Sequence, residues 1–144
     1  MAFRIRAFTE ADTASLVALL GELGYPTTED EMLMRMVRFG DGHQTLIAET
    51  ADGSVAGFIG LVVVPVYEYS APVGYILALS VGSDFQGQGI GKALVVAAED
   101  WFRQRGAHDV RVNSGLQREG AHRFYESLGY EKTGFRFRKP LGEA

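Results

Sequence analysis

The stretch Gln86-Gly87-Gln88-Gly89-Ile90-Gly91-Lys92 stands between a strand-like run and a long amphipathic segment. Its glycines alternate with larger residues, and a helix is expected to begin directly after them. Glycine leaves room where a ligand must approach the backbone, and the first N–H groups of a helix have no partner within the helix. The stretch therefore predicts a loop that binds a phosphate group at a helix N-terminus.

Three phosphate-binding patterns compete for this loop. A P-loop needs glycine at position 86 and serine or threonine at position 93, where this chain has Gln86 and Ala93. A dinucleotide-binding fingerprint needs a third glycine at position 92, which is Lys92. The third pattern is Gln or Arg, two residues, Gly, one residue, then Gly or Ala, and it matches from Gln86 to Gly91 without a gap. The loop therefore favours the third pattern.

The composition limits the class of protein. The chain has 144 residues, of which 47% are hydrophobic, so we expect a single domain over residues 1–144. It has no apolar run long enough to cross a bilayer, and its start is too polar for a signal peptide, so we expect a cytoplasmic protein without a membrane partner. A net charge of −4 disfavours nucleic acid as a partner. The chain has no cysteine and its three histidines are scattered, so we expect no metal.

Apolar periodicity and turn residues predict the order of elements. Strands are expected at 3–8, 44–50, 55–66, 74–81, 109–113 and 135–138, and helices at about 11–23, from Thr27 or Thr28 to near Gly40, and at about 89–105 and 120–128. The strand at 74–81 is apolar on both faces and should be central. This order predicts the α+β class, with a mixed sheet and helices on both of its faces.

Two motifs resemble those of the GNAT-type N-acetyltransferase superfamily. The loop from Gln86 to Lys92 is similar to its motif A, and the stretch from Ala121 to Tyr130 is similar to its motif B. The opening Arg4-Ile5-Arg6 with Asp12 also resembles the family. The resemblance implies the GNAT fold, whose mixed, mostly antiparallel sheet has about six to seven strands flanked by about four helices. It also implies that acetyl-CoA is the acyl donor and that the acetyl group passes directly to a primary amine of a small molecule or peptide.

The resemblance assigns most of the expected site to the donor. In the family, the strand before the glycine loop pairs with the pantetheine arm, and the loop binds the pyrophosphate through backbone amides. The donor-binding residues expected from this are Leu79, Ser80, Val81, Gln86, Gly87, Gln88, Gly89, Ile90, Gly91, Lys92, Asn113, Arg118, Ala121 and Tyr125. Arg118 stands where the family motif commonly has asparagine, and either a CoA phosphate or solvent is its expected neighbour. Asn113 is either a contact to the thioester or a strand-end cap.

Tyr125 is the expected catalytic residue. The resemblance implies that its phenol reaches the CoA sulfur and protonates the departing thiolate, and a phenol with a pKa near 10 can donate to a basic thiolate in a dry site. Packing in the core is the other interpretation. Many relatives carry a carboxylate in the strand before motif A, where this chain has Leu77 and Ala78. Glu68 in the preceding loop is a candidate for the general base or amine anchor, a water relay is another, and an amine of low pKa needs no base.

Two classes of function stay open. The first is an N-acetyltransferase, and the second is an acyl-CoA sensor or regulatory module without turnover, which the missing strand carboxylate favours and Tyr125 opposes. The acceptor is not revealed, and the loops at 25–30 and 67–72 are expected to select it. The edge of the C-terminal strand allows a homodimer.

Overall fold

The computed structural model describes residues 2–113, 119–134 and 136–142, and the chain divides into two compact units. The first unit comprises residues 1–112 and holds the whole β-sheet. The second unit begins at residue 113 and holds one helix within its described part. That the two units form the single domain expected over residues 1–144 stays a prediction.

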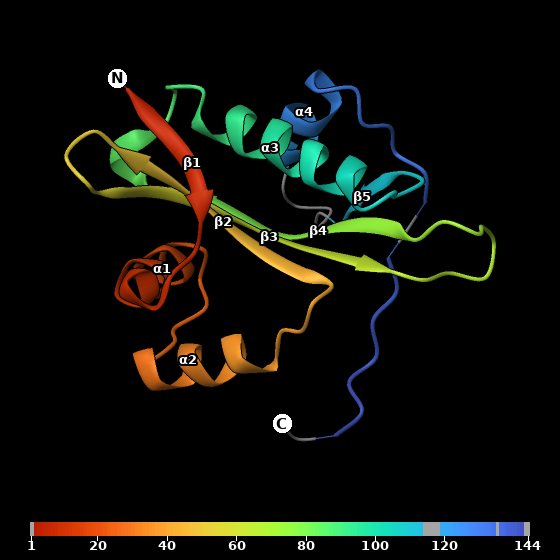
Figure 1. The fold of residues 1–144 in the computed structure, drawn as a ribbon, viewed down its shortest axis with the longest axis horizontal. Coiled ribbons are helices and arrows are strands. Elements are labelled where there is room, and N and C mark those ends of the chain that lie inside the picture. Colours follow the sequence, from red (N-terminus) through yellow and green to blue (C-terminus); the bar gives the residue numbers. More distant parts are fainter. Residues whose placement is uncertain (1, 114–118, 135, 143–144) are drawn as a thin grey trace. The chain divides into compact units, whose positions relative to one another are not determined.

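The sheet of the first unit has the strand order β1-β2-β3-β4-β5 (Figure 1). Its strands are β1 (Phe3–Ala7), β2 (His43–Thr50), β3 (Val55–Val64), β4 (Val73–Val81) and β5 (Val110–Val112). The first four strands pair with one another in antiparallel fashion, and β5 is parallel to β4. The α+β class and the mixed, mostly antiparallel sheet are therefore confirmed, and β4 has a neighbour on each side, as its apolar sequence predicted.

The expected number of strands is wrong, because the described residues form five strands and not six or seven. The alternation of Phe and Arg at 135–138 predicted a final strand, but residues 136–138 belong to no strand. An alternating pattern shows only that a segment could present two different faces. A strand also needs the edge of a neighbour to pair with, and a short segment does not specify that neighbour. The homodimer expected from that edge stays a prediction.

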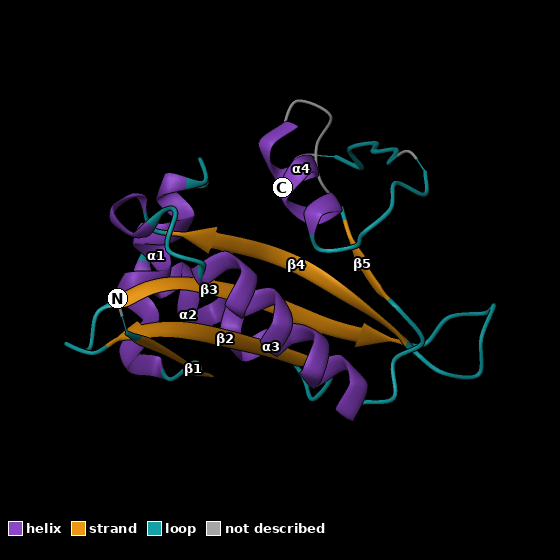
Figure 2. Ribbon diagram, turned by 90° about the horizontal axis from the view of Figure 1, so that it is seen from above, coloured by secondary structure: helices purple, strands orange, loops and turns teal. Residues whose placement is uncertain are grey.

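Helices cover both faces of the sheet in the first unit (Figure 2). The helices α1 (Thr13–Glu22) and α2 (Glu29–Arg38) lie on one face, and α3 (Ile90–Gln104) lies on the other (Figure 1). Local sequence sets the start of α2, because Thr28 Oγ1 accepts a hydrogen bond from Glu31 N at 3.1 Å and the Glu31 carboxylate accepts one from Thr28 N at 2.8 Å. This is a capping box, and it satisfies two backbone donors at the helix start.

The core has one part on each face of the sheet. Between the sheet and α1 and α2, a buried cluster consists of Leu16, Leu19, Met32, Ile47 and Phe58. On the other face, α3 buries Ile90, Leu94, Val95, Ala98 and Phe102. Gly74 of β4 lets α3 come close, since a Cβ placed there would lie 2.5 Å from the Phe102 ring. The core therefore fixes α3 against the strand that precedes it.

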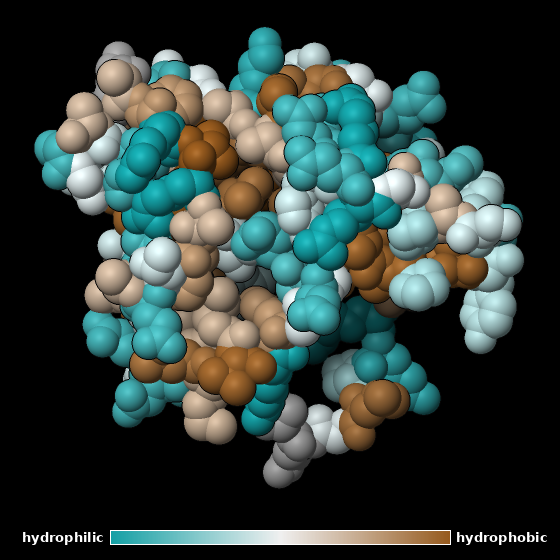
Figure 3. Space-filling model, in the orientation of Figure 1, coloured by the Kyte–Doolittle hydropathy of each residue, from teal (hydrophilic) through white to brown (hydrophobic). Residues whose placement is uncertain are grey.

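The surface of α2 is partly apolar. Figure 3 shows apolar side chains gathered over this helix, and Met34 and Val37 are both exposed. Met32 is buried instead, and Met36 packs half-buried against the core cluster. Of the methionines on this helix, Met34 is therefore the one directed to solvent.

In the second unit, the helix α4 (Glu119–Ser127) carries Tyr125. The Tyr125 ring lies edge-on to Phe124, at 5.1 Å between centroids, and to Tyr130, at 5.7 Å. Across the described chain, no helix is both long and apolar enough to cross a membrane.

Candidate active site

The glycine loop joins β4 to α3 through a short 3-10 turn at Ser83–Phe85. Gly87 and Gly89 have φ angles of 76° and 80°, in the left-handed region that side chains disfavour. A Cβ at either position would meet no atom of the described residues within 4 Å. The glycines are therefore required by the conformation of the backbone, and no described atom crowds the space above them.

Side chains hold the β4 side of this loop in place. Gln86 Nε2 donates a hydrogen bond to the carbonyl oxygen of Val81 at 2.7 Å, which links the loop to the end of β4. Ser83 N donates to Glu22 Oε1 at 2.9 Å, which links the preceding turn to the end of α1. The structure thus gives Gln86 a contact that closes the loop, and its contact with the donor stays a prediction.

The start of α3 presents backbone donors to the open space. Helical hydrogen bonding begins at Ala93, whose N–H donates to Gly89 O at 3.0 Å. The N–H groups of Ile90, Gly91 and Lys92 come before it and have no acceptor within the helix. The Ile90 side chain is buried in the core, whereas Lys92 is exposed. A fixed helix start with successive N–H groups and a nearby cation can bind an anion such as a pyrophosphate.

The strand β4 has an unpaired edge next to this loop. β5 pairs with β4 only from Gly74 to Ile76, whereas β3 pairs with β4 as far as Val81. From Leu77 to Val81, no described strand therefore lies on the β5 side of β4. The register between β3 and β4 also shifts here, which leaves Leu77 without a partner on β3 and its side chain 55% exposed. A free strand edge of this length can pair with an extended ligand that carries amide groups.

Ser80 and Glu68, two of the residues expected at the site, lie at different places along β4 and its loops. Ser80 is buried, and its Oγ lies 3.5 Å from the carbonyl oxygen of Leu19 in α1, so its side chain is directed into the core. Glu68 is exposed in the loop between β3 and β4, at the opposite end of β4 from the glycine loop. A strand of nine residues is about 30 Å long, so Glu68 and the glycine loop are far apart.

Other expected residues belong to the second unit. Asn113 directly follows β5 and is exposed, while Ala121 and Tyr125 lie in α4. Arg118 lies outside the described residues. The roles of these four residues stay predictions. Among the residues that the structure describes, no group of three or more His, Asp or Glu side chains could hold a metal ion.

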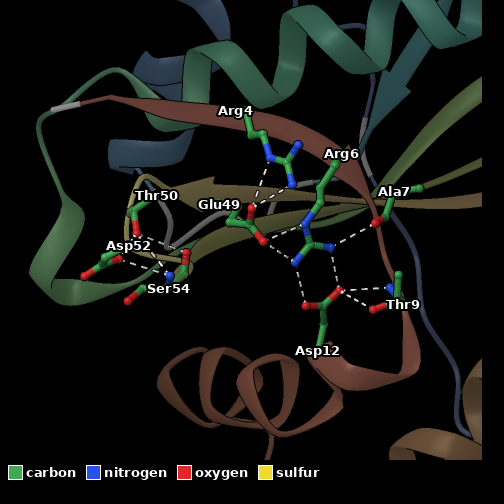
Figure 4. Close-up of polar contacts among 9 residues, drawn as sticks. All are labelled: Arg4, Arg6, Ala7, Thr9, Asp12, Glu49, Thr50, Asp52 and Ser54. Atoms are coloured by element: carbon green, nitrogen blue, oxygen red, sulfur yellow. Dashed lines mark hydrogen bonds and ion pairs between the residues drawn. The ribbon is translucent and has the colours of Figure 1, made fainter.

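The sequence did not reveal an ion-pair network beside the start of α1 (Figure 4). Arg6 donates to both carboxylate oxygens of Asp12, each at 2.8 Å, and to Glu49 at 2.8 and 2.9 Å. Arg4 also contacts Glu49, at 3.0 Å. The Arg6 guanidinium holds the pKa values of Asp12 and Glu49 below their usual range. In the sequence, the alternation of Arg4 and Arg6 is the signal for such a network. Their shared partner Glu49 can be identified only from the register between β1 and β2.

Leu77 was also missed as a feature of the site. The sequence identified it only as a position without a carboxylate, because an unbroken apolar run gives no sign of a shift in register. The exposed leucine marks the point at which β5 stops pairing with β4.

Comparison with known proteins identifies the family. The model of the acetyltransferase (GNAT) family matches residues 7–130. The chain is 32% identical over 142 residues to aminoalkylphosphonate N-acetyltransferase of Salmonella typhimurium, which covers 95% of this chain and 90% of that protein. It is 32% identical over 145 residues to aminoglycoside N(6′)-acetyltransferase type 1 of Stenotrophomonas maltophilia, with 95% and 93% covered.

Solved structures show the same fold. An acetyltransferase from Trypanosoma brucei superposes with a TM-score of 0.83 at 27% identity, covering 97% of this chain and 100% of that one. The glycine loop, the unpaired edge of β4 and the family match over residues 7–130 agree with one another. The chain belongs to the acetyltransferase (GNAT) family and is an N-acetyltransferase.

Proposed function

We propose that this protein transfers an acetyl group from acetyl-CoA directly to a primary amine of a small molecule or peptide. The observation that carries the proposal is the open glycine loop at the start of α3, which directly continues the unpaired edge of β4. The two relatives described above are named for the acetylation of aminoalkylphosphonates and aminoglycosides, which supports an amine acceptor.

The loop and the strand edge are spaced as the donor requires. Between its pyrophosphate and its sulfur, the pantetheine arm has about twelve covalent bonds, the length of about four extended residues or ~14 Å. Counted back from Val81 along β4, that length reaches Leu77, where the register shifts. The backbone of β4 would bind the arm, and the thioester would lie beside Leu77 and Ala78.

We assign the proton transfers as follows. Tyr125 Oη donates a proton to the sulfur of the departing CoA, which avoids the release of a basic thiolate. The amine must lose a proton before or during its attack, since an alkylammonium has no lone pair. The position of Glu68 at the far end of β4 favours removal of this proton through water, or uptake of an amine that is already neutral.

The proposal is tested with the purified full-length chain. Calorimetry measures CoA binding, and a thiol-release assay with acetyl-CoA screens aminoalkylphosphonates, aminoglycosides, polyamines, amino acids and peptides. We expect binding of CoA and thiol release with at least one class, above the rate of hydrolysis without amine. No binding at millimolar CoA would overturn the donor assignment. Binding without thiol release from any amine would instead indicate a CoA-binding module.

A further inference from the structure

Arg111 of β5 directs its side chain to the face of the sheet on which α1 and α2 lie. In β4, a Cβ on Gly74 would point at the Phe102 ring of α3, so the next residue, Tyr75, faces the other way. Arg111 is in register with Tyr75 across the parallel pair of β4 and β5. Because residues side by side in a sheet point to the same face, both side chains are directed away from α3 (Figure 1).

Arg111 is held by its neighbours and keeps donors for a ligand. Its Nε donates to one carboxylate oxygen of Asp109 at 3.1 Å, and its Nη2 lies 3.5 Å from the other. Hydrogen bonds to Asp109 and to Tyr75 raise the pKa of the guanidinium, so its charge is permanent. A guanidinium carries five N–H donors, which is more than these contacts use, and the side chain is 35% exposed. Arg111 can therefore offer an oriented and accessible fork of donors to an anion.

The acceptor amine of the proposed function would approach from this same face. Its target, the thioester, would lie beside Leu77 and Ala78 at the free edge of β4. On the opposite face, α3 packs against the sheet as far as Gly74 and blocks that approach. Tyr75 precedes Leu77 by two residues, so Arg111 would lie ~7 Å along the sheet from the reacting amine.

This distance suits a small acceptor with a second functional group. The long arginine side chain covers part of the ~7 Å, so only a few bonds would separate that group from the amine. Carboxylates and phosphates bind a guanidinium through two parallel hydrogen bonds, whereas a second cation is repelled. Asp109 competes for the same guanidinium, and it would weaken the binding of an anion without preventing it.

We propose that Arg111 selects acceptors that carry an anionic group a few bonds from the amine. Short amino acids and phosphorylated amino alcohols have this form. The inference rests on the proposed function, because it takes the amine to react beside Leu77. It adds a substrate class to that function, which is small zwitterions in place of polycations.

The test compares acceptors that differ only in the anionic group. β-Alanine is paired with its neutral amide, and O-phosphoethanolamine is paired with ethanolamine, in the thiol-release assay with acetyl-CoA. We expect the wild-type kcat/KM to be higher for the anionic member of each pair. Arg111→Gln should lower the ratio of anionic to neutral kcat/KM by about tenfold, because a charge-assisted hydrogen bond is lost. Asp109→Asn should raise the same ratio, because it removes the competing carboxylate.

Arg103→Gln is the matched control. Arg103 also pairs with an aspartate, Asp100 at 3.0 Å, but it belongs to α3 on the opposite face of the sheet. The substitution removes the same charge and the same kind of ion pair, and the ratio should stay as in wild type. An equal fall of the ratio in Arg103→Gln would show an effect of net charge and would overturn the contact with Arg111.

The outcomes separate this inference from the proposed function. A wild-type preference for the neutral members, or an unchanged ratio in Arg111→Gln, would overturn the role of Arg111 while acetyl transfer to amines remains. Thiol release with other amines but with neither anionic acceptor would do the same. If the wild-type protein releases no thiol with any amine, the proposed function fails and the inference fails with it. Thermal unfolding of each variant checks that the sheet stays folded.

Discussion

Asp12 is almost fully buried, and its carboxylate accepts hydrogen bonds from Arg6 and from the backbone of Thr9. These contacts lower its pKa in the folded protein. Since the unfolded value is about 3.9, the carboxylate stabilises the fold above that pH, and its contribution is lost as the pH falls through the lower folded pKa. We expect Asp12→Asn to reduce the free energy of unfolding by about 2–3 kcal/mol at pH 7. The difference from wild type should shrink below about pH 4.

Urea unfolding at pH 7 and between about pH 2 and pH 5 measures this difference. Asp100→Asn is the control, because the ion pair of Asp100 with Arg103 is exposed and should contribute less than about 1 kcal/mol. Equal losses in the two variants would contradict a special role for Asp12.

Gly89 and Gly21 make a contrasting pair of glycines. Gly89 has a φ of 80°, so Gly89→Ala should cost about 1–2 kcal/mol of stability and weaken CoA binding as the loop changes shape. Gly21 lies within α1, where a Cβ would meet none of the described atoms within 4 Å, so Gly21→Ala should stabilise the protein by about 0.5–1 kcal/mol. Urea unfolding and CoA calorimetry check both variants. A loss of CoA binding in Gly21→Ala would show that the effect is not specific to the loop.

Tyr125 is expected to act on the leaving group and not on affinity. Tyr125→Phe removes the proton donor and keeps the ring that packs against Phe124 and Tyr130. Because a well-placed general acid contributes at least about a hundredfold, we expect kcat to fall by about that factor while CoA binding stays unchanged. Steady-state kinetics and calorimetry separate the two effects, and an unchanged kcat would remove Tyr125 from the mechanism.

At the scale of elements, features that nearby residues determine could be predicted from the sequence, whereas features that depend on pairing between strands could not. Thr28 at the start of α2 and the glycine loop at the start of α3 each act within a few residues, so the sequence contains the whole signal. The segment at 135–138 and the register shift at Leu77 depend on a partner strand that no local pattern identifies. The conformation of the glycine loop could therefore be predicted, whereas the free edge that continues it could only be carried over from the family.

The packing of α3 on β4 gives a test at the same scale. A Cβ on Gly74 would overlap the Phe102 ring, so Gly74→Ala should cost about 1–3 kcal/mol. In the double variant with Phe102→Leu, the loss should be smaller than the sum of the two single losses, because the smaller side chain makes room. Gly60→Ala on β3 is the control, since its nearest neighbour to a Cβ would be 4.0 Å away. Additive losses in the urea unfolding of the double variant would contradict the steric explanation.

For the molecule as a whole, the sequence identified the donor better than the acceptor. In the proposed function, donor binding would use backbone groups of one loop and one strand edge, and such a site is marked in the sequence by glycines and apolar residues. Acceptor binding would use side chains from loops such as 25–30 and 67–72, where Tyr25 and Tyr67 are both exposed. Loops vary without disturbing a fold, so their residues alone do not name a substrate.

The whole chain also limits the order of the chemical steps. It has no cysteine, and Ser80, the serine expected at the site, turns its side chain into the core toward Leu19. An acyl-enzyme on a cysteine or on Ser80 is therefore not expected, and we expect the amine to attack while the donor is still bound. Initial rates measured over a grid of acetyl-CoA and amine concentrations should give double-reciprocal lines that intersect. Parallel lines, or an acetylated protein detected by mass spectrometry after incubation with acetyl-CoA alone, would instead require a covalent intermediate on this chain.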